Sequence, residues 1–458
     1  MKKFLFMFLL AAAVASVFTF VVADEDQDGK KFVIHGEIRE RADYNDNFFD
    51  FDNDVADSFL IFPYRARLAA EGHFGKGVVG YAEFQTIGVW GDDIPNFGET
   101  PGPVGGTSDG SSLSNVLGNS FILDQNINND GNNDVKLYQG YIALTDIAGS
   151  HFTLKFGRQE IVKGSEMLLG DNDFYAGLSH DAALACWNTD SIDLDLWWSR
   201  PFQSQFGVFG TPDHGSVNFY GAWVDFKKIP ANINVAAYLL YYEDGRQAGL
   251  PDPARRAFYT VGGRANHSAD PGQSGLVWSG ELALQKGDFN NGPSRGDTGD
   301  ISAMAFELMA GWQFHTGNAD HIIKGFFARA SGDDDPLDSD NESFDPLFQD
   351  SHMRYGFTDL FTLSDLTAAS IGWNMRMNDH SFGVDYWMYR MTEEELIAGN
   401  NEDDLGTEID GWWKYQYSPN TQVMAGVGLF MPGDAIEASL GTSADSYMRV
   451  LGNLRLRF

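Results

Sequence analysis

Hydrophobic and polar residues alternate with a period of two along most of this sequence. In the closing segment 447–458, Val450 and Phe458 share one parity, whereas Arg449 and Arg455 share the other. Because successive side chains of a β-strand point to opposite faces, this segment is predicted to form a strand with one apolar and one charged face. The same alternation recurs at 64–71, 192–198, 278–285, 304–315 and 408–417.

The polar faces of these predicted strands carry full charges. An unpaired charge in an apolar core costs several kcal/mol, so a packed sandwich or a small filled barrel does not fit the pattern. Charges on the inward faces of many strands indicate an interior that holds water. The opposite, apolar faces indicate a surrounding lipid phase.

Short segments rich in turn-forming residues alternate with longer polar segments. The short segments lie at 74–77, 146–150, 188–191, 228–232, 267–274, 316–320, 378–380 and 418–420. The long segments lie at 45–58, 91–134, 161–180, 202–215, 243–253, 287–299, 333–366, 392–404 and 432–445. Eight turns and nine loops connect 18 strands, and an even strand number places both termini on one side. The sequence therefore predicts an all-β, transmembrane antiparallel barrel of about 18 strands, with short periplasmic turns, long extracellular loops and an aqueous lumen.

The N-terminal residues have the order of a secretory signal peptide. Lys2 and Lys3 precede an apolar run at 4–22, and Ala23 precedes the acidic stretch DEDQDG. No other window supplies the ~20 consecutive apolar residues that a membrane-spanning helix needs. We therefore assign 1–23 to a signal peptide and 24–458 to a single barrel domain in the outer membrane of a Gram-negative bacterium.

Composition excludes several classes of function. The formal net charge of −34 argues against nucleic acid as a partner. Cys186 is the only cysteine, so no intramolecular disulfide can form. The sequence has no Gly-x-Ser-x-Gly elbow and no zinc-binding motif, and we expect no enzymatic activity. Aromatic residues make up 14% of the chain and cluster near the ends of predicted strands, which fits interfacial girdles.

Three stretches resemble the alginate-export porin family. They are LYQGY at 137–141 followed by FGRQE at 156–160 and LGDN at 169–172, ASGDDDP at 330–336 followed by SFDPLF at 343–348, and GTEID at 406–410 followed by GLFMPG at 428–433. The pairs Arg39/Arg41 and Arg65/Arg67 also look like the N-terminal strands of the family. The resemblance implies an 18-stranded outer-membrane channel, often with an arginine-rich, electropositive lumen for a polyuronate.

The inward parity of this chain mixes both signs of charge, unlike a purely basic lumen. We predict that the channel is lined by Arg39, Arg41, Arg65, Arg67, Glu83, Arg158, Glu281, Glu307, Arg376, Glu408, Asp410, Arg449 and Arg455. A mixed lining selects solutes by size and by the transverse field across the pore. An alternative role for the arginines is to balance neighbouring carboxylates and to fix the strand tilt.

Arg158 raises a conflict of parity, because Leu154 and Phe156 of the same predicted strand face lipid. A bulge at Gly157 would reset the register and turn Arg158 inward, and we favour this interpretation. The alternative is that Arg158 lies outward, beyond the hydrocarbon layer.

Acidic loop segments are candidates for calcium binding, and no other cofactor is expected. Asp124–Asp130 and Asp333–Asp335 offer oxygen ligands. The stretch 24–29 resembles the start of an EF-hand loop, but His35 stands where the glutamate ligand belongs, so an EF-hand is excluded. Solvated acidic loops without a bound ion are the common alternative.

Two long loops could fold into the lumen. The 91–134 loop is rich in Gly, Ser, Asn and Asp, whereas the 333–366 loop contains aromatic residues and is the better candidate for packing inside. An external lid is the alternative. Deleting 337–350 is predicted to raise the single-channel conductance.

These features predict a channel for small hydrophilic solutes, either carbohydrates, including an anionic polysaccharide, or organic acids. A barrel that sheathes an electron-transfer cytochrome and a non-conducting structural barrel are the alternatives. The expected partners are outer-membrane lipid, a small polar solute or oligosaccharide, and the barrel-assembly machinery, which would recognise the closing strand through Phe458. We expect neither a catalytic residue nor a metal ligand among the channel-lining residues.

Overall fold

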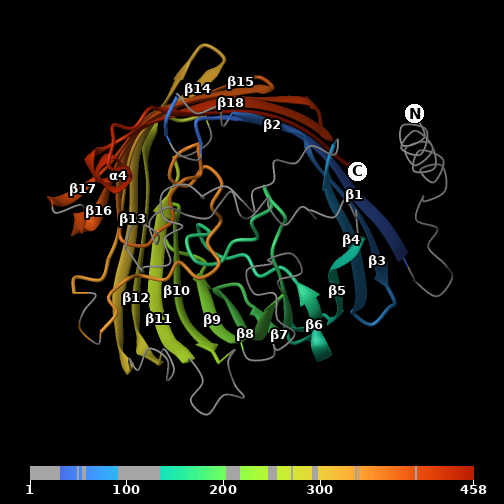
Figure 1. Ribbon diagram of the computed structural model, residues 1–458. Coiled ribbons are helices and arrows are strands. Elements are labelled where there is room, and N and C mark those ends of the chain that lie inside the picture. The colour runs from blue at the N-terminus through green and yellow to red at the C-terminus, as the bar shows by residue number, and fades with distance from the viewer. Residues whose placement is uncertain are drawn as a thin grey trace.

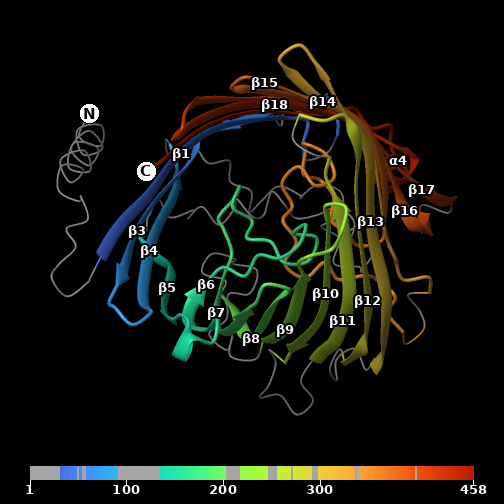
Figure 2. The same cartoon turned by 180° about the vertical axis from the view of Figure 1, so that it is seen from behind.

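The chain folds into a closed antiparallel barrel in the computed structural model (Figures 1 and 2). The structure describes residues 31–48, 51–53, 58–90, 135–202, 217–245, 255–269, 272–290, 298–335, 338, 340–397 and 400–458. The predicted signal peptide at 1–23 and the 91–134 loop lie outside these described residues. In the described ranges, no helix has the length and apolar composition that crossing a bilayer requires.

The strands follow one another around the barrel in chain order. They are β1 (Lys31–Asp46), β2 (Phe59–Ile61), β3 (Pro63–His73), β4 (Val78–Val89), β5 (Lys136–Leu144), β6 (Phe152–Gln159), β7 (Ser179–Asn188), β8 (Ile192–Phe202), β9 (Val217–Phe226), β10 (Ile233–Asp244), β11 (Arg255–His267), β12 (Gly275–Asn290), β13 (Thr298–Thr316), β14 (Ala319–Ala330), β15 (Leu366–Met377), β16 (His380–Ile397), β17 (Asn400–Ser418), β18 (Thr421–Pro432) and β19 (Tyr447–Arg457). A 3-10 turn (Ile147–Gly149) and the short helix α4 (Asp434–Leu440) complete the described elements.

Counting β2 and β3 as one interrupted strand gives 18 strands, because both pair with β1. β1 also pairs with β19, which closes the barrel, and all of the pairs are antiparallel. The predicted fold is therefore confirmed. Each of the eight predicted short turns joins two neighbouring strands of this order.

One predicted loop, 392–404, is wrong over most of its length. β16 continues to Ile397 and β17 starts at Asn400, so the two strands form an extended hairpin. Its acidic sequence lacks the alternation that a membrane-embedded strand needs. Backbone pairing alone defines these strand ends, which lie beyond the part of the wall that has an apolar face. A register shift after Tyr389 separates this hairpin from the regular part of the wall.

The two faces of the wall differ as predicted. On β11 to β13, the outward side chains Val261, Leu284, Met304 and Leu308 are each about half exposed. The inward side chains alternate with them and are largely buried. Their burial arises because chain segments fold into the barrel, where the segments after β6 and after β14 are visible inside the ring of strands (Figures 1 and 2).

Candidate functional site

Two loop segments enter the lumen and bind each other there. Segment 160–178 joins β6 to β7, and segment 340–365 forms most of the connection from β14 to β15. Their backbones are joined by hydrogen bonds from Gly170 N to Phe348 O (2.7 Å), Phe348 N to Leu168 O (3.0 Å) and Asp350 N to Glu166 O (3.1 Å). A Cβ on Gly170 would lie 2.6 Å from Asp350 N, so this close approach requires glycine.

Segment 340–365 packs inside the barrel as its aromatic content predicted. Phe344, Tyr355, Phe357, Phe361 and Leu363 are buried, and most of them contact inward side chains of the wall. The inward folding of segment 160–178 was not predicted, because its sequence shows only a long connection. The apolar run Met167–Leu169, which is buried in the structure, is the sequence feature that could have indicated this inward folding.

The predicted channel-lining residues Arg39, Arg41, Arg65 and Arg67 anchor segment 160–178 to the wall. Arg39 donates to the carbonyl oxygens of Asp173 (2.5 Å) and Tyr175 (2.9 Å), and Arg65 donates to the Asp173 carboxylate at 2.7 Å. Arg65 is 1% exposed. These two guanidinium groups, which were predicted to face water in the pore, thus contact a loop instead.

Arg41 donates to Phe174 O at 2.8 Å, and Arg67 donates to Asp173 Oδ1 at 2.8 Å. Although burial raises the pKa of Asp173, the guanidinium groups of Arg65 and Arg67 hold that pKa well below its usual range. Asp173 therefore stays ionised and neutralises part of the arginine cluster.

The predicted acidic lining residues anchor the second segment. Glu307 accepts hydrogen bonds from Arg354 Nη1 (2.8 Å) and from the Tyr355 hydroxyl (2.6 Å). Glu408 accepts from the backbone N–H of Phe357 at 2.6 Å, and Asp410 accepts from the same N–H at 3.1 Å.

Glu281 contacts the first segment, because its carboxylate accepts a hydrogen bond from the Ser165 hydroxyl at 2.6 Å. Glu83 is also buried and accepts from Gln139 Nε2 at 2.9 Å. Carboxylates on three strands, β12, β13 and β17, thus hold the inward chain through hydrogen bonds, a role that the alternation pattern could not distinguish from lining an open pore.

The remaining predicted basic residues differ in exposure. Arg376 lies on the inward parity near the short-turn end of β15 and is exposed. Arg455 is partly exposed and donates to Gln422 Oε1 at 3.2 Å. Arg449 is buried between Asp43 and segment 340–365. Of these three, Arg376 and Arg455 remain accessible to a solute.

The expected inward position of Arg158 is wrong. β6 pairs with β5 and β7 without a register shift, and the neighbouring Gln159 is the residue that faces inward. Arg158 therefore keeps the outward parity of Phe156 and forms an ion pair with Asp181 on β7 (2.8 Å). The extra residue lies on the adjacent strand β5, where the pairing with β4 shifts at Tyr138.

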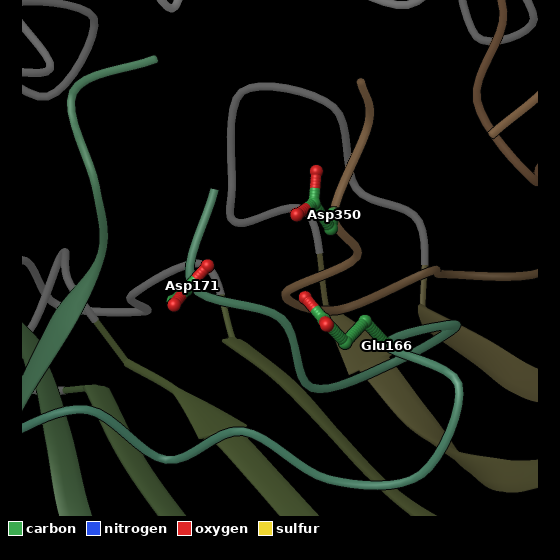
Figure 3. A group of neighbouring side chains, drawn as sticks. All are labelled: Glu166, Asp171 and Asp350. Carbon is green, nitrogen blue, oxygen red and sulfur yellow. The ribbon is translucent and has the colours of Figure 1, made fainter. Parts of the chain in front are cut away.

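Three carboxylates converge where the two segments meet. Glu166 and Asp171 belong to segment 160–178, Asp350 belongs to segment 340–365, and one oxygen of each lies within 4.8 Å of the others (Figure 3). Burial and then the charges of Asp350 and Asp171 raise the pKa of Glu166 to about 7. Burial and Asp173 likewise raise the pKa of Asp171. This cluster can hold a proton, and its oxygen atoms are of the type that calcium prefers.

The calcium candidate Asp124–Asp130 lies outside the described residues, as does the stretch 24–29, which was excluded as an EF-hand. Asp333–Asp335 lies at the start of the β14–β15 connection, where burial and then Asp333 raise the pKa of Glu342 to about 7.

A partly exposed apolar patch lies beside the inward segments. Phe174, Met353 and Trp412 pack against a small buried cluster of Phe357, Met424 and Leu451. The ammonium group of Lys414 lies 5.1 Å from the centre of the Trp412 ring. The alternation of apolar and polar residues does not predict this patch. Phe174 and Met353 belong to loops, and Trp412 shares the inward parity with charged residues.

An 18-stranded closed barrel with an apolar outer face and a charged, loop-narrowed lumen defines a porin-type channel of the bacterial outer membrane. The chain belongs to the alginate export family, whose model matches residues 33–449. It is thus a channel for small solutes, with a role in transport rather than catalysis. A search of curated proteins gave no match.

Solved outer-membrane channels have the same fold. Pseudomonas aeruginosa OpdO is 13% identical over 93% of this chain and 97% of its own, with a TM-score of 0.57. P. aeruginosa OpdK is 10% identical over 93% and 99%, with a TM-score of 0.58. OccAB2 of Acinetobacter baumannii is 10% identical over 93% and 98%, with a TM-score of 0.56. At these identities, the likeness concerns the fold alone.

Proposed function

We propose that the channel passes small organic acids that carry a carboxylate beside a compact apolar face. The observation that supports this proposal is the Phe174–Met353–Trp412 patch, with Lys414 beside it. An apolar surface in a hydrated lumen favours solutes that can cover it, and a few placed polar groups then orient them. Arg455, on the same wall, offers a second cation to the solute.

The narrowed lumen supports small solutes over a polymer or a second protein. The inward segments occupy space that a sheathed cytochrome would need. At their junction, Glu166, Asp171 and Asp350 oppose a strongly anionic polyuronate. One structure of P. aeruginosa OpdK was solved with vanillate, an aromatic acid. No catalytic step is part of this proposal.

Planar-bilayer recordings of the purified mature chain test the proposal. We expect discrete conductance steps, and we expect a small aromatic acid such as benzoate to interrupt the current more often than acetate or glucose at equal concentration. Trp412→Ala should remove the difference between benzoate and acetate while leaving the channel open. Tyr417→Ala is the matched control, because Tyr417 lies on the same strand with its side chain outward and 69% exposed. Equal blocking by all three solutes would refute the proposed solute class.

A further inference from the structure

A row of tyrosines marks one level on the outside of the barrel. Tyr241 of β10 is in register with Tyr220 of β9 and Tyr259 of β11, and the ring centres lie 6.0 and 4.5 Å from that of Tyr241. The row lies near the end of these strands that carries the long loops. Aromatic rows of this kind lie at the membrane–water interface, so this level is the outer boundary of the hydrocarbon layer.

The strand register shows which residues of β12 and β13 lie at the same height as the tyrosine row. Tyr259 is in register with Lys286, and Lys286 is in register with Ser302. Lys286 is exposed on the outward parity, and in the described part of the chain no carboxylate lies within 4.0 Å of its ammonium group. An outward lysine at the interface suits a lipid phosphate.

A groove of about 560 Å³ opens at this level and is called here the outer groove. It forms because β14 ends at Ala330, whereas β13 reaches back to Thr298, and the chain after β14 runs beside this free edge. Asn341 fixes that course, since it accepts a hydrogen bond from Ser302 N at 3.1 Å and donates one to Asp300 O at 2.8 Å.

The lining of the outer groove changes from apolar to charged. Its apolar part consists of Tyr259, Val261, Leu284, Ala303 and Met304. Its polar part consists of Lys286, Gln285, Ser302, Ser331, Gly332, Asp334, Glu342 and Glu393. Val261 and Leu284 are about half exposed, and in register they lie on the hydrocarbon side of the Tyr259–Lys286 pair. The groove thus has the polarity of one amphiphile that lies with its tail toward the membrane centre.

The carboxylates set the chemistry of the head group. Burial and then the charges of Asp333 and Asp334 raise the pKa of Glu342. Among the described residues, no lysine or arginine nitrogen lies within 4.0 Å of a carboxylate oxygen of Asp334, Glu342 or Glu393. A bare phosphate would pair with Lys286 but would be repelled by Asp334, Glu342 and Glu393. A phosphate that carries a divalent cation complements both charges, because carboxylate and phosphate oxygens are ligands for magnesium and calcium.

We propose that the outer groove is a specific site for a lipopolysaccharide molecule of the outer leaflet. Its acyl chain lies along Val261, Leu284 and Met304, and its phosphate pairs with Lys286. A magnesium or calcium ion bridges that phosphate to Glu342, Asp334 and Glu393. The long-loop end of the barrel faces the leaflet in which this lipid is the major component, which distinguishes it from a phospholipid of the inner leaflet.

Native mass spectrometry of the full mature chain in detergent, with a rough-type lipopolysaccharide as the probe, tests the site. With magnesium present we expect one lipid to remain bound. Excess EDTA removes the bridging ion and should lower the affinity by about tenfold or more, which corresponds to about 1.4 kcal/mol or more. Lys286→Gln should weaken binding in both conditions. The triple variant Asp334→Asn, Glu342→Gln, Glu393→Gln should remove the difference between magnesium and EDTA.

Lys228→Gln is the matched control, since Lys228 is an exposed lysine in a short turn at the other end of the barrel. Heat-dependent gel mobility verifies that each variant forms the barrel, and Lys286→Arg should restore binding. Unchanged binding by Lys286→Gln and the triple variant would overturn the proposal. So would equal retention of phosphatidylethanolamine, or a protein dimer in place of the lipid adduct. Conductance of the same preparations reports the channel function separately.

Discussion

Arg449 of β19 forms a buried ion pair with Asp43 of β1, with 2.7 Å between Nη2 and Oδ2 and 3.0 Å between Nε and Oδ1. The two side chains are 6% and 3% exposed. Arg449 Nη1 also donates to Asp359 Oδ2 at 2.8 Å. One guanidinium group therefore joins the first strand, the last strand and the inward segment 340–365.

Because of this buried contact, we expect the substitution Asp43→Asn to lower the stability of the folded barrel strongly. Asp43→Asn leaves Arg449 buried with one partner lost, and breaking a buried pair costs about 3–5 kcal/mol. We expect a clearly lower urea midpoint for unfolding in detergent, followed by tryptophan fluorescence. Arg390→Gln is the control, because its pair with Asp403 is exposed and worth about 0–1 kcal/mol. Similar midpoints for the two variants would contradict this ranking.

Deleting residues 337–350 is expected to raise the single-channel conductance. The deletion removes Phe344, which is buried, and the Phe348 backbone that binds segment 160–178. Both segments should then withdraw from the lumen, which widens the conducting path. A deletion of 398–399, in the connection between β16 and β17, serves as the control because it leaves the inward segments intact. An unchanged conductance of the 337–350 variant would show that this segment does not limit the current.

Gly170→Val tests the contact between segments 160–178 and 340–365 by adding a side chain at a point where their backbones lie close together. Its Cβ would approach Asp350 N to 2.6 Å and the Asp350 Cβ to 2.8 Å, so the two segments must separate. We expect larger or noisier current steps in planar bilayers and little change in the unfolding midpoint. Gly325→Val, whose Cβ would meet only a backbone oxygen at 3.8 Å, should behave like the natural protein. Identical recordings for all three proteins would contradict the role of this contact.

The strength of the junction should depend on pH through Glu166. Since burial and then Asp350 raise its pKa to about 7, the folded contact favours the protonated form. Its stabilisation is complete below the ordinary glutamate pKa of about 4.3 and is lost as the pH rises through about 7. The amide protection factor of Asp350, whose N–H donates to Glu166 O, should therefore fall across that window.

Glu166→Gln should make the Asp350 protection factor independent of pH over the same window. Glu342→Gln is the control, because the pKa of Glu342 is also raised to about 7 but its carboxyl belongs to the outer groove. If Glu342→Gln removes the pH dependence and Glu166→Gln retains it, the assignment to Glu166 is wrong.

Phe458 contacts Gly36 where β1 and β19 pair to close the barrel. Phe458 N donates to Gly36 O at 3.0 Å, Gly36 N donates to Phe458 O at 2.8 Å, and the Phe458 ring covers Gly36 so closely that a Cβ there would lie 2.2 Å from it. We expect Phe458→Ala and Gly36→Val both to lower the yield of folded barrel in outer membranes. Refolding into detergent distinguishes the causes: if the assembly machinery reads Phe458, then Phe458→Ala should refold far better than it assembles in cells. Equal losses in both assays would assign the effect to the seam alone.

The alternation along the chain determined the barrel, its strand number and the positions of its turns. Those features depend on local rules, since successive side chains on a strand face opposite ways and a membrane requires one apolar face. The same rules placed Arg65, Glu307 and Glu408 on the inward side. They failed at Arg158, where parity was correct and the added bulge was not, and at the acidic β16–β17 hairpin, which has no apolar face to reveal it.

Only the tertiary structure decided what the inward charges contact. Whether Arg65 meets water or Asp173 depends on the path of a segment more than a hundred residues away in the chain, as their separation of 108 shows. The convergence of Glu166 with Asp350 and the apolar patch at Trp412 depend on the same long-range folding. Periodicity describes neighbours along one strand, whereas these contacts are set by backbone hydrogen bonds and close packing between two loops, which no single segment encodes.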